Sequence, residues 1–136
     1  MLKKITGRLH LRLRKGEKGH IIWQLMVDYI LLLRLRIYKL IKGIKHPIVH
    51  YYALCWNEEK MLPFMFDYYD KFVDQFVIYD NYSTDRSEEI IKAHRNARII
   101  KFKTEGNDNI AKMNIKNQCW KQSRGKADFV VVCDMD

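Results

Sequence analysis

Four apolar segments alternate with more polar ones along residues 46–136. The apolar segments are rich in β-branched and aromatic residues and predict strands at 48–56, 75–80, 97–103 and 127–134. The stretches between them carry helical patterns after short polar turns, and they predict helices within 57–72, 81–96 and 110–125. Strands that alternate with helices over short links are typical of a mainly parallel sheet covered by helices. We therefore expect an α/β fold.

Polar residues and prolines indicate where these helices begin and end. Asn57 is a candidate cap for the first helix, with two glutamates in its first turn, and Pro63 is expected to kink or shorten that helix. Ser83 or Asp85 is expected to cap the second helix. Gly125 is expected to close the third.

Residues 20–45 have a different pattern, which predicts one long helix. Apolar residues recur at helical spacing at Ile22, Met26, Tyr29, Leu33, Ile37 and Leu40. Charged residues interrupt the segment, and its longest apolar run, 29–33, is far below the roughly 20 residues that a membrane span needs. Two interpretations stay open: a helix lying in a membrane interface, with Trp23 and Tyr38 as anchors, or a helix packed on another part of the protein or on a second copy.

The net charge of +9 is concentrated in this N-terminal part. Residues 1–45 contain 12 Lys and Arg against two Asp and Glu, a net charge of +10, whereas residues 46–136 contain 13 against 14. The sequence thus divides into a basic arm with an amphipathic helix (1–45) and a neutral domain (46–136). The whole chain is 48% hydrophobic, which is enough for a core. We expect an anionic membrane surface as a partner of the arm and no nucleic acid, because the domain itself has no basic face.

Acidic and amide residues follow three of the four predicted strands, in the segments CWNEE, YDNYSTD and CDMD. Because the carboxyl ends of parallel strands meet at one edge of a sheet, these groups are expected to converge there. Neither GxGxxG nor GxxxxGK[ST] occurs, which disfavours dinucleotide-binding and P-loop folds. Carboxylate oxygens suit Mg²⁺ or Mn²⁺, and three widely spaced cysteines without a CxxC pair favour neither zinc nor disulfides.

These segments, in this order and spacing, resemble the donor-binding half of family 2 glycosyltransferases with the GT-A fold, over residues 46–136. The resemblance implies a donor nucleotide site, with a divalent metal, Mn²⁺ or Mg²⁺, at the acidic pair that ends the sequence. The implied nucleotide-binding residues are Leu54, Asn57, Glu58, Asp80, Asn81, Asp85, Lys116, Asn117 and Asp134, and the implied metal ligands are Asp134 and Asp136. Asn81 stands where the family has a second aspartate, which leaves the base undetermined.

The function that the resemblance implies is sugar transfer from a nucleotide-diphosphate donor to a surface glycan or a lipid-linked acceptor, on the cytoplasmic side of a membrane. The family's catalytic base follows the acidic pair, so we expect it beyond residue 136 and assign no catalytic residue. We accordingly expect the chain to be an N-terminal fragment that binds the donor without full catalysis. The alternative is a non-catalytic membrane- or nucleic-acid-binding module with a small α/β domain.

Overall fold

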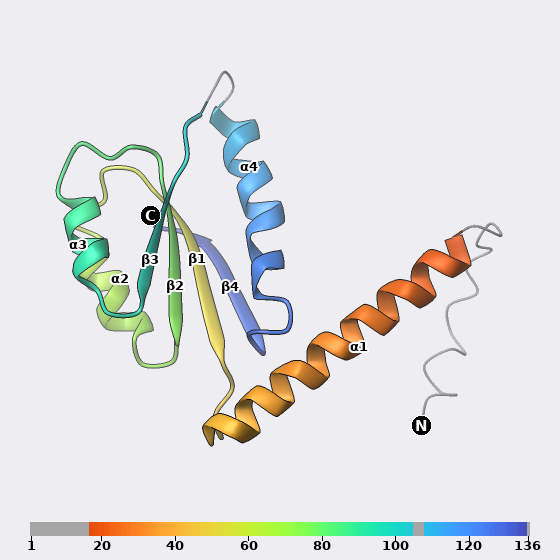
Figure 1. The fold of residues 1–136 in the computed structure, drawn as a ribbon. Coiled ribbons are helices and arrows are strands. Elements are labelled where there is room, and N and C mark those ends of the chain that lie inside the picture. The colour runs from red at the N-terminus through yellow and green to blue at the C-terminus, as the bar shows by residue number, and fades with distance from the viewer. Residues whose placement is uncertain (1–16, 105–107, 136) are drawn as a thin grey trace.

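The protein is an α/β fold with a four-stranded, all-parallel sheet flanked by helices, as the alternating pattern predicted (Figure 1). A computed structural model describes residues 17–104 and 108–135. Its elements in chain order are α1 (Glu17–Lys42), β1 (Val49–Cys55), α2 (Leu62–Tyr69), β2 (Gln75–Asp80), α3 (Ser87–Ala93), β3 (Ala97–Lys101), α4 (Asp108–Cys119), the 3₁₀ helix η3 (Trp120–Ser123) and β4 (Phe129–Asp134).

The strand order in the sheet is β3-β2-β1-β4, so β1 is a central strand. The chain first builds outward from β1 to β2 and β3, then returns past β1 to add β4 on its other side. The order therefore reverses between β1 and β4, where Leu54 pairs with Asp134 in the parallel register. In open parallel sheets this reversal is where ligands bind, beyond the carboxyl ends of the strands.

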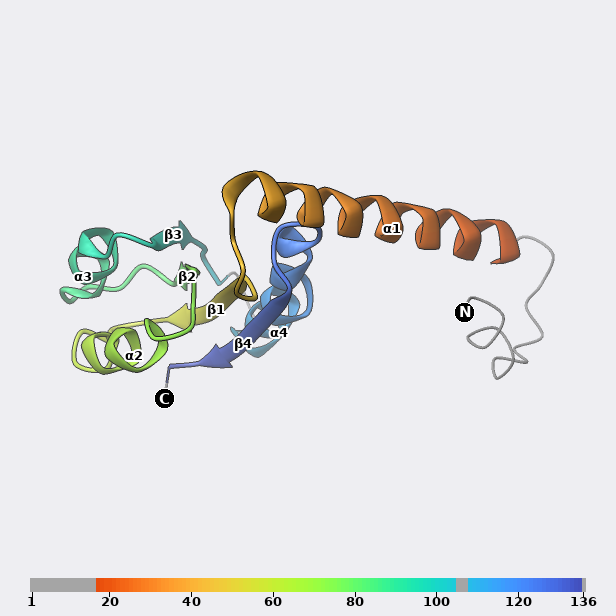
Figure 2. The same ribbon diagram turned by 90° about the horizontal axis from the view of Figure 1, so that it is seen from below.

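The sheet separates two apolar clusters. Alternate residues of β1 point to opposite faces, so Tyr51 packs in a cluster with Phe66 of α2 and Ile91 of α3, whereas Tyr52 packs with Cys119 of α4. Figures 1 and 2 show the corresponding arrangement, with α2 and α3 on one side of the sheet and α4 on the other. The helices therefore cover both faces of the sheet.

The expected start of the first domain helix was wrong. Asn57 does not cap α2, since its φ is 58° and the helix begins five residues later, at Leu62. Pro63 therefore lies in the first turn of α2, where its missing N–H costs nothing, and it does not kink the helix. The expected closure by Gly125 is confirmed: its φ is 69°, and it follows the 3₁₀ turn that ends α4.

Helix α1 packs on the domain along one narrow side. Leu35 is buried there, and Leu31 approaches Gly125 so closely that a Cβ on the glycine would lie 2.9 Å from the leucine Cβ. Ion pairs Lys39–Asp128 (2.8 Å) and Arg124–Asp28 (3.1 Å) flank this contact. No helix within residues 17–104 and 108–135 is long and apolar enough to cross a membrane.

Candidate functional site

A cleft of about 500 Å³ opens at the carboxyl ends of the strands, at the point where the strand order reverses. Five of the nucleotide-site residues expected from the sequence line it: Leu54, Glu58, Asn81, Lys116 and Asp134. They come from β1 and the loop after it, the loop after β2, α4 and β4. The predicted convergence of these groups on one edge of the sheet is therefore observed.

Lys116 and Asp134 form an ion pair at the wall of the cleft, with 2.5 Å between Nζ and Oδ2. The two side chains are 35% and 48% exposed, so water competes with the pair. Exposed pairs of this kind contribute about 0–1 kcal/mol, so a ligand can separate them at small cost. The lysine is then available to a phosphate and the carboxylate to a cation.

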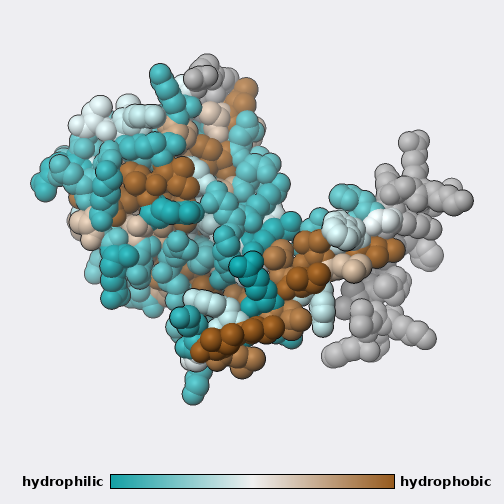
Figure 3. Space-filling model, viewed as in Figure 1, coloured by the Kyte–Doolittle hydropathy of each residue, from teal (hydrophilic) through white to brown (hydrophobic). Residues whose placement is uncertain are grey.

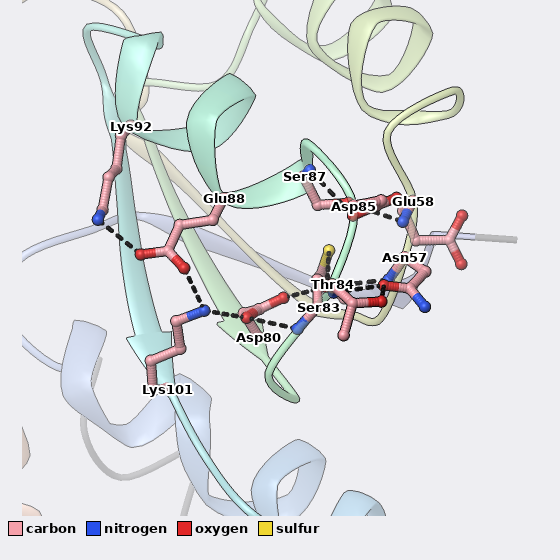
Figure 4. Close-up of polar contacts among 11 residues, drawn as sticks. Asn57, Glu58, Asp80, Ser83, Thr84, Asp85, Ser87, Glu88, Lys92 and Lys101 are labelled. Carbon is pink, nitrogen blue, oxygen red and sulfur yellow. Dashed lines mark hydrogen bonds and ion pairs between the residues drawn. The ribbon is translucent and has the colours of Figure 1, made fainter.

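Asp80, by contrast, is fully buried at the end of β2, and both of its oxygens already have partners. Oδ1 accepts a hydrogen bond from the Ser83 hydroxyl, and Oδ2 accepts hydrogen bonds from the Ser83 amide at 3.1 Å and Lys101 Nζ at 2.5 Å. Lys101 also pairs with Glu88 at 2.6 Å (Figure 4). Asp80 therefore holds the loop that carries Asn81, and its buried carboxylate does not line the cleft.

The loops after β1 and β2 are joined by side-chain to backbone hydrogen bonds (Figure 4). Asn57 Oδ1 accepts a hydrogen bond from the Thr84 amide at 2.7 Å, and the Ser83 hydroxyl accepts one from the Asn57 amide at 2.9 Å. The Ser87 hydroxyl accepts a hydrogen bond from the Glu58 amide at 2.8 Å. The segment DNYSTD thus fixes the position of the neighbouring loop as well as its own.

Asp85 completes this junction. The expected cap of this helix was wrong, because the N-cap of α3 is Arg86, which makes no side-chain capping hydrogen bond, and neither Ser83 nor Asp85 holds that position. The Asp85 carboxylate instead accepts hydrogen bonds from the amides of Glu59 and Ser87, both at 3.0 Å. Burial alone would raise the pKa of Asp85, but the hydrogen bonds, above all that from Ser87, lower it below its usual value. The carboxylate is therefore held in its charged form.

Two residues in these loops have strained backbones. Asn57 and Tyr82, with φ of 58° and 51°, are the non-glycine residues with positive φ in the described part of the chain. Such conformations cost about 1–3 kcal/mol each and cluster at functional sites. Here both lie in the two loops that border the cleft.

The remaining predicted residues fall outside the cleft. Asn57, Asp80 and Asp85 act in the loop junction, and Asn117 is exposed on α4. Asp136 lies outside the described residues, so its part in the acidic pair stays a prediction. Within residues 17–104 and 108–135 no group of three or more His, Cys, Asp or Glu side chains is placed to hold a metal ion.

Sequence reasoning missed part of the cleft wall. Asn109 and Lys112 line it together with Lys116, and their spacing of three and four residues places them on one face of α4. The sequence alone shows that these residues share one helix face, but only the fold shows that this face borders β1 and β4. Trp56, 59% exposed, adds an aromatic ring to the rim.

Comparison with known proteins adds no family assignment. The chain matches no known family model, and no match was found among curated proteins.

Proposed function

We propose that this cleft binds the nucleotide diphosphate of a sugar donor, and that residues 46–136 are the donor-binding part of a GT-A glycosyltransferase. The observation that carries the proposal is the convergence of Leu54, Glu58, Asn81, Lys116 and Asp134 on one cleft where the strand order reverses. The resemblance of the three loop segments to family 2 glycosyltransferases supports it. The acceptor would be a surface glycan or a lipid-linked sugar.

The chemistry of the cleft wall suits a diphosphate attached to a planar base. Lys112 and Lys116 supply cations for phosphate oxygens, and Trp56 offers an exposed ring to a base. Asn81 and Glu58 supply hydrogen-bonding groups that can select among bases. The buried network around Asp80 holds these loops before a ligand arrives, which lowers the entropic cost of binding.

The acidic pair of the sequence would hold the divalent cation. Asp134 lies at the cleft, and its carboxylate oxygens are ligands of the type that Mg²⁺ and Mn²⁺ prefer. Asp136 and the diphosphate would supply further oxygens. When bound, the cation would neutralise charge on the departing nucleoside diphosphate.

Thermal unfolding of the full chain tests the proposal. UDP, GDP and ADP are titrated with Mn²⁺, Mg²⁺ or EDTA, because a ligand that binds only the folded state raises the unfolding temperature. We expect at least one nucleoside diphosphate to stabilise the chain in a metal-dependent way, and its sugar conjugate to bind at least as tightly. Absence of stabilisation by every one of them, with either metal, contradicts the proposal.

Matched variants locate the binding site. Lys116→Gln removes a charged phosphate contact and should weaken binding by roughly tenfold or more. Lys121→Gln makes the same charge change at η3, outside the cleft, and should leave binding unchanged. Asp136→Ala should abolish the metal dependence but not the folding of the chain. Equal weakening by Lys116→Gln and Lys121→Gln would show that binding is not at this cleft.

A further inference from the structure

Most of the apolar surface of α1 does not pack on the domain. Its domain side is formed by Leu31, Leu35 and the ion-paired Asp28 and Lys39. The opposite side, here called the outward face, carries large apolar side chains that are each 45–80% exposed: Ile22, Met26, Tyr29, Leu33, Ile37 and Leu40. Figure 3 shows hydrophobic side chains gathered along this helix. A contiguous patch of this kind indicates an interaction surface.

A second cleft, of about 610 Å³, borders this helix at the amino-terminal edge of the sheet. Four cationic residues line it and define what we call the basic cleft: Arg34, Arg95, Arg98 and Lys126. None of the four forms an ion pair with any residue in 17–104 or 108–135. Arg98 donates a hydrogen bond to the neutral Gln122 side chain at 3.1 Å.

The acidic side chain in the lining of this cleft does not neutralise the four cations. Asp74 Oδ1 lies 3.0 Å from His46 Nε2, and its Oδ2 accepts a hydrogen bond from the Val49 amide at 2.8 Å. His50 in the cleft wall senses the positive charge of this cleft. Burial lowers the pKa of His50, Asp74 opposes that shift, and the positive charges of Lys126 and Arg98 lower the pKa further. The cleft is therefore a site for anions, and its guanidinium groups suit phosphate.

The basic cleft and the outward face adjoin along α1. Arg34 directly follows Leu33 and precedes Ile37 by three residues, so the cation stands at the edge of the apolar face. Trp23 and Tyr38 are exposed on the same helix, at 64% and 48%. An apolar face edged by cations and aromatic rings is the pattern of a helix that lies in a membrane interface.

We propose that α1 lies on an anionic membrane, with the outward face in the acyl boundary and the basic cleft holding lipid phosphate groups. A second copy of the chain would bring two +10 arms together, which opposes association through this face. A nucleic acid would pair with the cations but leave the apolar side chains in water. An anionic membrane satisfies both features. The proposal does not depend on the donor site, which lies at the opposite, carboxyl-terminal edge of the sheet (Figure 1).

Vesicle flotation of the full chain tests this proposal, with phosphatidylcholine alone or with 30% phosphatidylglycerol, at low and high salt. We expect binding to the anionic vesicles that weakens with salt, and little binding to the neutral ones. Each cation near an anionic surface is worth about fivefold in affinity, so Arg95→Gln/Arg98→Gln/Lys126→Gln should lose roughly 100-fold. The control Lys60→Gln/Lys71→Gln/Lys103→Gln changes the net charge equally at exposed positions outside that cleft and should bind more tightly than the cleft variant.

The outward face has its own variant and readout. Leu33 and Ile37 are 45% and 47% exposed, so Leu33→Ser/Ile37→Ser should keep its circular dichroism and thermal unfolding but lose vesicle binding. In a Trp56→Phe/Trp120→Phe background, Trp23 fluorescence should shift to the blue on anionic vesicles and be quenched by brominated acyl chains. Three results would each overturn the proposal. They are a Trp23 emission that vesicles leave unchanged, equal vesicle binding by the cleft variant and its control, and a dimer in sedimentation that Leu33→Ser/Ile37→Ser dissociates.

Discussion

Replacing Gly125 with alanine tests how α1 is seated on the domain. A Cβ at Gly125 would lie 2.9 Å from both Cβ and Cδ2 of Leu31 and 3.1 Å from its backbone oxygen. Because the Leu31 Cβ and backbone cannot rotate away, the helix or the turn must shift. Gly125 also has a φ of 69°, a conformation that costs an L-residue about 1–2 kcal/mol.

Gly43 provides a matched control, since it has a φ of 65° but no heavy atom within 4 Å of the point where an alanine Cβ would lie. Gly43→Ala should therefore lower the free energy of unfolding by only the backbone strain, about 1–2 kcal/mol. Gly125→Ala adds overpacking, typically about 1–3 kcal/mol, for a total of about 2–5 kcal/mol.

Urea titrations followed by circular dichroism give both free energies by linear extrapolation. Limited proteolysis is a second measurement, because a displaced α1 should be cut faster in Gly125→Ala than in Gly43→Ala. Equal losses of stability and equal cleavage rates would refute the reasoning, since they would mean that α1 does not press on Gly125.

Three further predictions concern the loops and the pH dependence of stability. Asn57→Gly loses the hydrogen bond to Thr84, worth about 1 kcal/mol, but relieves the strain of the positive φ, whereas Asn57→Ala loses the same bond and keeps the positive φ. Alanine should therefore lower the free energy of unfolding by about 1–2 kcal/mol more than glycine does; urea titration showing alanine no worse than glycine would contradict this. Hydrogen bonds from Lys101 and Lys92 lower the pKa of Glu88 to about 2, so its stabilisation is complete above its usual pKa of 4.5 and is lost as pH falls toward 2. Glu88→Gln should remove that part of the acid sensitivity in pH-dependent thermal unfolding, and an unchanged pH profile would count against the pairing. Burial lowers the pKa of His50 below 6.5, so stability should fall as pH drops through 6.5, and His50→Gln should flatten that slope in the same measurement; a slope as steep as that of the parent chain would argue against a buried, neutral histidine.

The sequence predicted the sheet because each strand is a short apolar run bounded by polar turns. β1, β2, β3 and β4 all lie within the predicted segments, and their alternation with helices was enough to predict parallel pairing. The convergence of polar groups at one edge followed from the same rule. These predictions needed only the local hydrophobic pattern and the rule that strands alternating with helices pair in parallel.

Long-range contacts account for what the sequence did not predict. The helical spacing of Leu33 and Ile37 identifies an apolar stripe, but not that it faces away from the domain. Asn57 is a residue type that often caps helices, yet its side chain accepts a hydrogen bond from the amide of Thr84, 27 residues later. This contact exists only in the folded protein. The residues of the basic cleft also come from separate segments of the chain, so no sequence motif predicts this cleft.

The strand order also has a consequence for the order of folding. His50 pairs with Gln75 across 25 residues, whereas Val49 pairs with Phe129 across 80. Closing the longer loop costs about 1 kcal/mol more in chain entropy, so we expect β1, β2 and β3 to pair first and β4 to dock last. Pulsed hydrogen exchange in which β4 amides are protected as early as those of β2 would contradict this. The candidate donor cleft is bounded by β1 and β4, so it would form only when β4 docks in the last step of folding. A ligand that binds this cleft would therefore stabilise only chains in which β4 has docked.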